Sequence, residues 1–124
     1  MNNNIYTVLI ADSDFESGKN LEKILLNEDF QVFIVDSARK VFECIRKWEI
    51  NIAIIDVDLK DIEGYKIIPL IKDINKDIKV IITISKNSPE LEGKCRATGI
   101  IYYAIKPLNY EEIVNVVKYA LKIN

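Results

Sequence analysis

The sequence predicts one doubly wound α/β domain built from five strand–helix pairs. Five short runs rich in Val and Ile alternate with stretches in which apolar residues recur at helical spacing. Nearly continuous β-branched runs are typical of parallel strands that are covered on both faces. The 124 residues, 49% of them hydrophobic, suit a single domain over residues 1–124 with a core of ordinary size.

The expected strands end at polar residues. They cover residues 7–11, 31–35, 51–55, 79–84 and 100–105. Asp12, Asp36 and Asp56 follow the first three, and Lys106 and Pro107 follow the fifth. Because parallel strands end at the same edge of a sheet, these polar side chains should gather at one edge, where open α/β sheets bind ligands.

Four of the five segments that follow the strands carry clear apolar stripes at helical spacing. The stripes are Leu21, Ile24 and Leu25; Phe42, Ile45 and Trp48; Ile67, Ile68, Ile71 and Ile74; and Ile113, Val116, Val117, Ala120 and Leu121. Asn109 and Glu112 have the spacing of a capping box at the start of the last helix. We expect Pro69 to remove a hydrogen bond or kink the third helix about one turn in. The fourth helix, from about Ser88, contains Gly93 and few apolar anchors, so we expect it to be the loosest.

The absence of histidine excludes several kinds of site. The chain cannot build a Ser-His-Asp or Cys-His nucleophile or a histidine-ligated zinc centre by itself. Cys44 and Cys95 have no second cysteine nearby, so we interpret them as reduced, partly buried thiols rather than metal ligands. Any chemistry must therefore use carboxylates, hydroxyls and lysine.

Net charge and hydropathy indicate which binding partners and which cellular compartment to expect. A formal charge of -2 with scattered basic residues predicts no direct nucleic-acid binding. No apolar run is long enough to span a bilayer, and the polar residues 1–4 do not look like a signal peptide. We therefore expect no membrane partner and a cytoplasmic location.

The polar residues expected at one sheet edge suggest a phosphoryl-transfer site. They are Asp12, Ser13 and Asp14; Asp56 and Asp58; Thr83 and Ser85; and Lys106. Oxygen ligands with one or two carboxylates suit Mg²⁺, and a carboxylate can also attack phosphorus. Taken singly, such residues also serve as helix caps, turn hydroxyls or solvated lysines. The joint placement of acids, hydroxyl and lysine favours the phosphoryl site.

Three segments carry a resemblance to a known family. They are residues 8–14 (VLIADSD), residues 54–59 (IIDVDL) leading to Ile62-Glu63-Gly64, and residues 99–108, which end in Lys106-Pro107-Leu108. With them the chain resembles, over nearly its whole length, the receiver domain of bacterial two-component response regulators. The resemblance implies a flavodoxin-like fold with strand order 2-1-3-4-5. It also implies a switch, not an enzyme, that takes a phosphoryl group from a sensor histidine kinase or phosphotransfer protein.

The resemblance also implies roles for individual residues. Asp56 would be the phosphoryl acceptor, Lys106 its cationic partner, Tyr103 the aromatic whose rotamer follows the state, and Asp12, Ser13, Asp56 and the carbonyl of Asp58 the Mg²⁺ site. Two positions depart from the family pattern, because Ser13 stands where a second acid is usual and Lys60 where a proline is usual.

The switch hydroxyl is ambiguous in sequence. Counting back from Lys106 without gaps reaches Ile84, which has no hydroxyl, and a slip of one residue gives Ser85 or Thr83. We prefer Ser85 because it lies nearer the end of the strand. If Ile84 occupied the position, phosphate could not draw a hydroxyl toward itself.

Alternative functions remain open from sequence. A degenerate receiver would bind partners without being phosphorylated. Asp56 and Asp58 also resemble the Asp-x-Asp strand end of haloacid-dehalogenase-type phosphatases, although those carry it on the first strand. A flavin-binding domain is excluded, since an acidic turn after the first strand would repel the flavin phosphate. The downstream effector is unknown, and the resemblance leaves a homodimer open.

Overall fold

The computed structural model describes residues 5–123, so the interpretation of residues 1–4 lies outside the described part. Its five strands are β1 (Thr7–Ala11), β2 (Gln31–Val35), β3 (Ile52–Asp56), β4 (Lys79–Ile84) and β5 (Tyr102–Ile105). Its helices are α1 (Phe15–Asn27), α2 (Ala38–Lys47), a 3₁₀ helix η1 (Gly64–Ile67), α3 (Ile68–Ile74), α4 (Pro89–Arg96) and α5 (Tyr110–Ala120). The strands are parallel in the order β2-β1-β3-β4-β5, which confirms the predicted fold.

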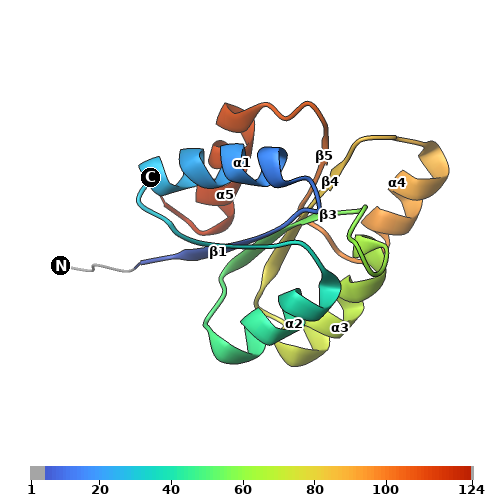
Figure 1. Ribbon diagram of the computed structural model, residues 1–124, viewed down its shortest axis with the longest axis horizontal. Helices are drawn as coiled ribbons and strands as arrows, with labels where there is room; N and C mark the ends of the chain where they lie inside the picture. The colour runs from blue at the N-terminus through green and yellow to red at the C-terminus, as the bar shows by residue number, and fades with distance from the viewer. Residues whose placement is uncertain (1–4, 124) are drawn as a thin grey trace.

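The sheet is covered on both faces (Figure 1). Helices α1 and α5 lie on one face, and α2, α3 and α4 lie on the other. Two apolar cores result, one under each helical layer, and β1, β3 and β4 contribute fully buried Ile and Leu side chains to both. This explains why the central strands read as unbroken apolar runs in the sequence.

Two strand boundaries differ slightly from the prediction. β3 covers Ile52–Asp56 instead of residues 51–55, and β5 begins at Tyr102 instead of residue 100. Trp48 was expected on the apolar stripe of the second helix, but it follows the end of α2 and is 48% exposed. Its indole stacks instead on Phe33 of β2. Short apolar runs fix the existence of an element better than its ends.

The expectation that Pro69 disturbs a helix interior is wrong. The preceding segment forms the separate 3₁₀ helix η1, and Pro69 lies in the first turn of α3. A first-turn residue has no intrahelical acceptor for its amide, so proline is tolerated there. The apolar residues Ile67 and Ile68 therefore belong to two different helices that pack on the same core.

Helix α4 has few buried anchors. Ser88 caps its amino end by accepting the amide of Leu91, and Pro89 occupies the first turn. Only Cys95 is buried, whereas α5 buries Ile113, Val114 and Val117. In residues 5–123, no helix is both long and apolar enough to cross a membrane.

Candidate functional site

Two acidic side chains meet where the strand order reverses. Asp12 follows β1 and Asp56 ends β3, and these two strands are neighbours whose successive connections run to opposite sides of the sheet. Ala11 pairs with Ile55, so the next residues along both strands leave the sheet at the same level. Asp12 is 8% exposed and Asp56 only 2%. Two buried carboxylates at one point require a nearby cation.

Lys106 supplies that cation from the end of β5. Its Nζ lies 2.9 Å from Oδ2 of Asp12 and 2.5 Å from Oδ2 of Asp56. Burial alone would lower the pKa of Lys106, but the hydrogen bonds to Asp56 and Asp12 outweigh it and raise the pKa above the ordinary lysine value. The site therefore holds two carboxylates and a charged ammonium that neutralise one another in part.

Asp56 is fixed by two further hydrogen bonds. The amide of Asp58 donates to Oδ1 at 2.7 Å, and the hydroxyl of Thr83 donates to Oδ2 at 3.1 Å. Among the described residues, no buried side-chain oxygen or nitrogen lacks a partner. The carboxylate thus has one fixed orientation, with Oδ2 shared between Thr83 and Lys106.

The structure brings Thr83, and not Ser85, into contact with Asp56. Thr83 pairs with Asp56 in the β3–β4 ladder and is 2% exposed. Ser85 lies beyond the end of β4 and is exposed, while Ile84 points to the other face and packs in the same core as Tyr103. Side chains of a strand alternate between faces, so pairing register, and not nearness to the strand's end, selects the contact.

In the turn after β1, the side chains of Ser13 and Asp14 make contacts in different directions. Ser13 donates its hydroxyl to the carbonyl of Asp58 at 2.6 Å, which joins the β1 turn to the loop after β3. Asp14 points instead to α1, where its carboxylate accepts the amides of Glu16 and Ser17 as a helix cap. Asp14 therefore does not replace the missing second acid of the pocket.

The oxygen groups of the pocket fit Mg²⁺. The donors are the carboxylates of Asp12 and Asp56, the carbonyl of Asp58 and the hydroxyl of Ser13. Magnesium prefers such hard oxygen ligands and is commonly held by one or two carboxylates, with water and phosphate oxygens completing its shell. Within residues 5–123, no group of three or more His, Cys, Asp or Glu side chains is arranged to hold a metal, so a carbonyl and a hydroxyl would have to complete the protein's share of the ligands.

The loop after β3 approaches Asp56 too closely for a side chain at Gly64. A Cβ atom there would lie 2.2 Å from the carbonyl oxygen of Asp56. The Gly64 amide donates to the carbonyl of Val57 at 2.8 Å and closes the loop. The glycine in the Ile62-Glu63-Gly64 segment is therefore required by this close approach.

The same loop is attached to the start of α2. Asp61 accepts the amides of Ala38 and Arg39 at 2.8 and 3.1 Å, and the hydrogen bond from Ala38 is the main cause that holds the pKa of Asp61 below its ordinary value. Lys60 forms an ion pair with Asp36 at 2.8 Å. The loop is thereby held at two points on the β2–α2 turn.

The family model described as the response regulator receiver domain matches residues 8–118 of the chain. This chain belongs to that family. It is therefore a receiver domain of a two-component response regulator, a signalling module and not an enzyme, which confirms the predicted family and sets the phosphatase aside.

The curated relatives are longer proteins. The receiver domain is 33% identical to the regulatory protein VanR of Enterococcus faecium over 93% of this chain and 49% of that protein. It is 29% identical to the two-component response regulator ARR12 of Arabidopsis thaliana, over 93% of this chain and 20% of that protein. The chain thus spans between one fifth and about half of these relatives.

Solved structures share the fold. A receiver domain protein from Methanospirillum hungatei superimposes with a TM-score of 0.91 at 24% identity, covering 96% of this chain and 95% of the other. The receiver domain described as BeF3-activated DrrB gives a TM-score of 0.87 at 23% identity, covering 96% of this chain and 99% of the other. At these identities the similarity shows the fold alone.

Tyr103 of this receiver domain faces inward. Its ring is 8% exposed, its hydroxyl donates to the side-chain oxygen of Asn87 at 2.6 Å, and the guanidinium of Arg96 lies 5.4 Å from the ring centroid. Burial raises the pKa of Tyr103. The aromatic is therefore connected to both the β4–α4 loop and α4.

The contacts of Asn87, Asp61 and the Lys60–Asp36 pair were not anticipated from sequence. Each joins segments that are separated by 16 to 24 positions along the chain. Asp36 directly follows a predicted strand, which indicates where that strand ends but gives no indication of the lysine with which Asp36 pairs. The only sequence signal for the cap was the number of aspartates after β3, one of which, Asp61, caps the start of α2.

Proposed function

We propose that this receiver domain accepts a phosphoryl group on Asp56 from the phosphohistidine of a sensor histidine kinase or phosphotransfer protein. A carboxylate oxygen of Asp56 would form the new P–O bond as the P–N bond of the donor breaks and its electron pair returns to the imidazole. The observation that supports it most directly is the 2.5 Å contact between Nζ of Lys106 and Oδ2 of Asp56, in a group of side chains that includes the exposed Ser13.

The chain's own residues have distinct parts in this proposal. Asp12, Asp56, the Asp58 carbonyl and Ser13 would hold Mg²⁺, which supplies positive charge that offsets the phosphoryl oxygens. Lys106 would pair with one of those oxygens, since it already contacts the acceptor. Thr83 contacts Oδ2 before any phosphorylation, so its hydroxyl is available without a large movement.

The added charge would change the surface formed by α4, β5 and α5. Lys106 directly follows β5, and Tyr103 on that strand contacts Asn87 and Arg96 on the α4 side. A shift of Lys106 toward a phosphoryl group would alter the end of β5, and the sparsely anchored α4 would respond. A downstream effector would read that surface.

Intact mass spectrometry tests the proposal directly. The unmodified chain is incubated with acetyl phosphate and Mg²⁺, beside a chelator control, Asp56→Asn and the matched Asp58→Asn, which removes the same charge two residues further on. We expect one metal-dependent phosphoryl group on the wild type and on Asp58→Asn, and none on Asp56→Asn. Equal labelling of Asp56→Asn, or labelling that ignores the chelator, would reject Asp56 as the Mg²⁺-dependent acceptor.

A second candidate is a degenerate receiver that binds partners without phosphorylation. It is favoured by Ser13, whose hydroxyl replaces an acid and engages the carbonyl of Asp58. A hydroxyl is a weaker Mg²⁺ ligand than a carboxylate. Ser13→Asp separates the two candidates: if a weak metal site limits the wild type, Mg²⁺ affinity and labelling should both rise in the variant. Labelling that stays absent in both proteins would favour the degenerate receiver.

A further inference from the structure

The loop that runs from β3 to η1 (the β3 loop, residues 57–63) sets the direction of one candidate metal ligand. Asp58 and Glu63 form an isolated antiparallel bridge that joins the two ends of this loop. The carbonyl of Asp58 belongs to the planar peptide unit that continues into Leu59, so its direction depends on both neighbours of that unit. On one side the amide of Asp58 is fixed, because it donates to Oδ1 of Asp56 at 2.7 Å. The other side depends on the middle of the loop.

The middle of the β3 loop is attached to the start of α2. The carboxylate of Asp61 accepts the amide of Ala38 at 2.8 Å and the amide of Arg39 at 3.1 Å, one on each oxygen. First-turn amides have no acceptor within their own helix, and a negative charge at the amino end of a helix is favourable. Both oxygens of Asp61 bond to α2, so this side chain holds the loop in place and is not one of the candidate metal ligands.

The other polar attachments of the middle of the loop are weaker. The amide of Lys60 donates to the carbonyl of Asp36 at 3.3 Å, which is long for such a hydrogen bond. The side chains of the same two residues form an ion pair, but the Lys60 side chain is 62% exposed, and ion pairs in solvent contribute little. The two hydrogen bonds of Asp61 have a charged acceptor and are therefore the stronger attachment.

On the pocket side, the Asp58 carbonyl faces the turn after β1. The hydroxyl of Ser13 donates to it at 2.6 Å, so the carbonyl is directed at the pocket while Asp61 holds the loop on α2. Only Leu59 and Lys60 separate Asp58 from Asp61. Each residue has two soft backbone dihedral angles, so a movement of Asp61 over so short a segment would also turn the Asp58 peptide unit.

We propose that Asp61 is a positioning residue for Mg²⁺. By fixing the middle of the β3 loop to α2, it keeps the Asp58 carbonyl directed at the metal position. This inference rests on the proposed function, in which that carbonyl is a ligand. Groups that orient a metal ligand without touching the metal commonly change the metal affinity by about tenfold or more when they are removed. In a released loop the carbonyl would have to be ordered on binding, and the entropy cost would lower the affinity.

The coupling between Asp61 and the metal site acts in both directions. If the Asp61 contact raises the affinity for Mg²⁺, bound Mg²⁺ stabilises the Asp61 contact by the same factor. The amides of Ala38 and Arg39 should therefore exchange more slowly with solvent when Mg²⁺ is added. The effect reaches α2, a helix that lies outside the α4–β5–α5 surface.

A Mg²⁺ titration of the intact chain, followed by the NMR shifts of the Asp58 and Ala38 amides, tests the proposal. Asp61→Ala removes both hydrogen bonds to α2, and we expect its dissociation constant for Mg²⁺ to be about tenfold higher than that of the wild type. Asp61→Asn keeps one oxygen acceptor, so its affinity should lie between the two. Mg²⁺ should slow the exchange of the Ala38 and Arg39 amides in the wild type but not in Asp61→Ala.

Two matched controls separate loop position from helix capping and from charge. Ser37 caps the same end of α2 by accepting the amide of Lys40 at 3.3 Å, but it lies outside the β3 loop. Glu63→Gln removes one negative charge from the β3 loop and breaks an exposed ion pair with Lys66. We expect Ser37→Ala and Glu63→Gln to bind Mg²⁺ within about twofold of the wild type.

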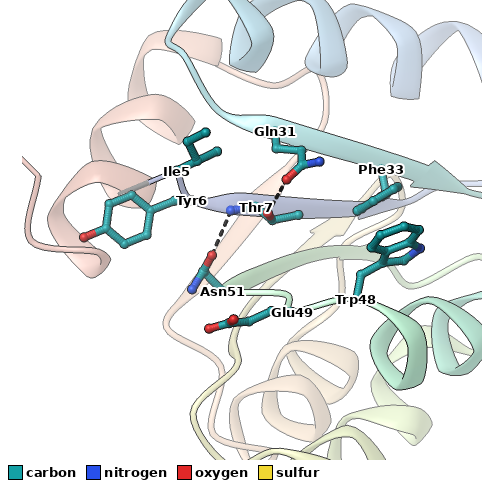
Figure 2. Close-up of a pocket in the computed structure, with 8 residues that line it drawn as sticks. All are labelled: Ile5, Tyr6, Thr7, Gln31, Phe33, Trp48, Glu49 and Asn51. Carbon is teal, nitrogen blue, oxygen red and sulfur yellow. Dashed lines mark hydrogen bonds between the residues drawn. The ribbon is translucent and has the colours of Figure 1, made fainter. Parts of the chain in front are cut away.

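The stability of the variants can be followed at the far end of α2. Figure 2 shows Trp48, the only tryptophan of the chain, beside Phe33, on which it stacks. Trp48 directly follows α2, so its fluorescence in urea reports the unfolding of each variant. We expect Asp61→Ala and Ser37→Ala to have comparable unfolding midpoints and different Mg²⁺ affinities, which a general loss of helix stability would not produce.

The positioning role is overturned if Asp61→Ala binds Mg²⁺ as tightly as the wild type, or if either control weakens binding as much as Asp61→Ala. It is also overturned if Mg²⁺ leaves the exchange of the Ala38 amide unchanged in the wild type. Asp12→Asn, which removes a proposed ligand, keeps this result apart from a failure of the site: if Asp12→Asn weakens binding and Asp61→Ala does not, only the positioning role fails. A wild type that binds no Mg²⁺, or an affinity that Asp12→Asn leaves unchanged, rejects the site and the positioning role together.

Discussion

Lys106 and Asp56, fifty positions apart in the chain, meet with Nζ 2.5 Å from Oδ2 in a pocket where both side chains are largely buried. Lys106 neutralises a carboxylate that would otherwise be a buried charge next to Asp12 with no cation to offset it. The geometry of the pair is set by the ends of β3 and β5, with β4 and Thr83 between them.

Lys106→Met should destabilise the receiver domain by about 3 kcal/mol in the absence of divalent metal, because it leaves Asp12 and Asp56 without a cation. Mg²⁺ should restore part of the loss by neutralising the same carboxylates. Urea unfolding with and without Mg²⁺ measures both effects. Lys94→Met removes an exposed ion pair with Glu90, which solvent screens, and should leave the stability almost unchanged. Equal losses in the two variants would contradict the buried-pair account.

Alkaline pH should destabilise the domain partly through Lys106. Its pKa is raised above 10.5 in the folded state, so its stabilising contribution is complete below that value and is lost as pH rises through the folded pKa. Tyr103, whose pKa is raised above 10.0 mainly by burial, contributes with the same sign. Free energies of unfolding measured between about pH 8 and about pH 11.5 should fall less steeply for Lys106→Met and for Tyr103→Phe than for the wild type. Unchanged slopes would show that neither group carries the effect.

Thr83→Val should lower the free energy of unfolding by about 1 kcal/mol, because it removes the hydroxyl that donates to Asp56 while keeping the side-chain shape. Thr83→Ser keeps the donor and should retain most of that stability. Ser85→Ala changes an exposed position and should have an effect within about 0.5 kcal/mol. Denaturant unfolding of the three variants checks this order. A larger loss for Ser85→Ala than for Thr83→Val would reverse the assignment of the hydroxyl.

Gly64→Ala should destabilise the domain by about 2 kcal/mol and impair labelling of Asp56, since the new Cβ would meet the Asp56 carbonyl at 2.2 Å. Gly93→Ala is the matched control, because a Cβ at that position in α4 meets nothing within 4 Å. It should stabilise the domain by about 1 kcal/mol. Hydrogen exchange should find α4 the least protected helix in the wild type and slower to exchange in Gly93→Ala. Protection of α4 equal to that of α5 would contradict this.

Asp61→Asn should weaken the start of α2 by about 1 kcal/mol, because the carboxylate caps the amides of Ala38 and Arg39. The pKa of Asp61 is lowered in the folded state, so this contribution is present above its ordinary value of 3.8 and is lost as pH falls through the folded pKa. Unfolding measured at neutral pH and near pH 3 should therefore show a smaller difference between variant and wild type in acid. A difference that grows in acid would exclude the capping role.

The sequence was sufficient for the fold because its signals are local. The short apolar, β-branched runs predicted β1, β2 and β4 with the ends that the structure shows. The spacing of Asn109 and Glu112 predicted where α5 begins, and Asn109 indeed caps that helix. The third helix was misjudged because apolar spacing alone cannot separate η1 from α3. Since α3 begins only at Ile68, Pro69 lies in its first turn, where proline is tolerated, and not in a helix interior. Trp48 was misjudged because its partner, Phe33, lies on another element.

The gathering of Asp12, Asp56 and Lys106 followed from the sequence, whereas most of the other contacts around them did not. Asp12, Asp56 and Lys106 stand at strand ends, and parallel strands must end together, so their proximity was predictable from element order alone. The β3–β4 register decided which hydroxyl contacts Asp56, because it sets Thr83 beside Asp56 and turns Ile84 to the opposite core. The caps made by Asp14 and Asp61 likewise depend on side-chain direction and strand neighbours. Local sequence fixes periodicity and chemistry, but which groups touch is decided by packing between segments that are distant along the chain.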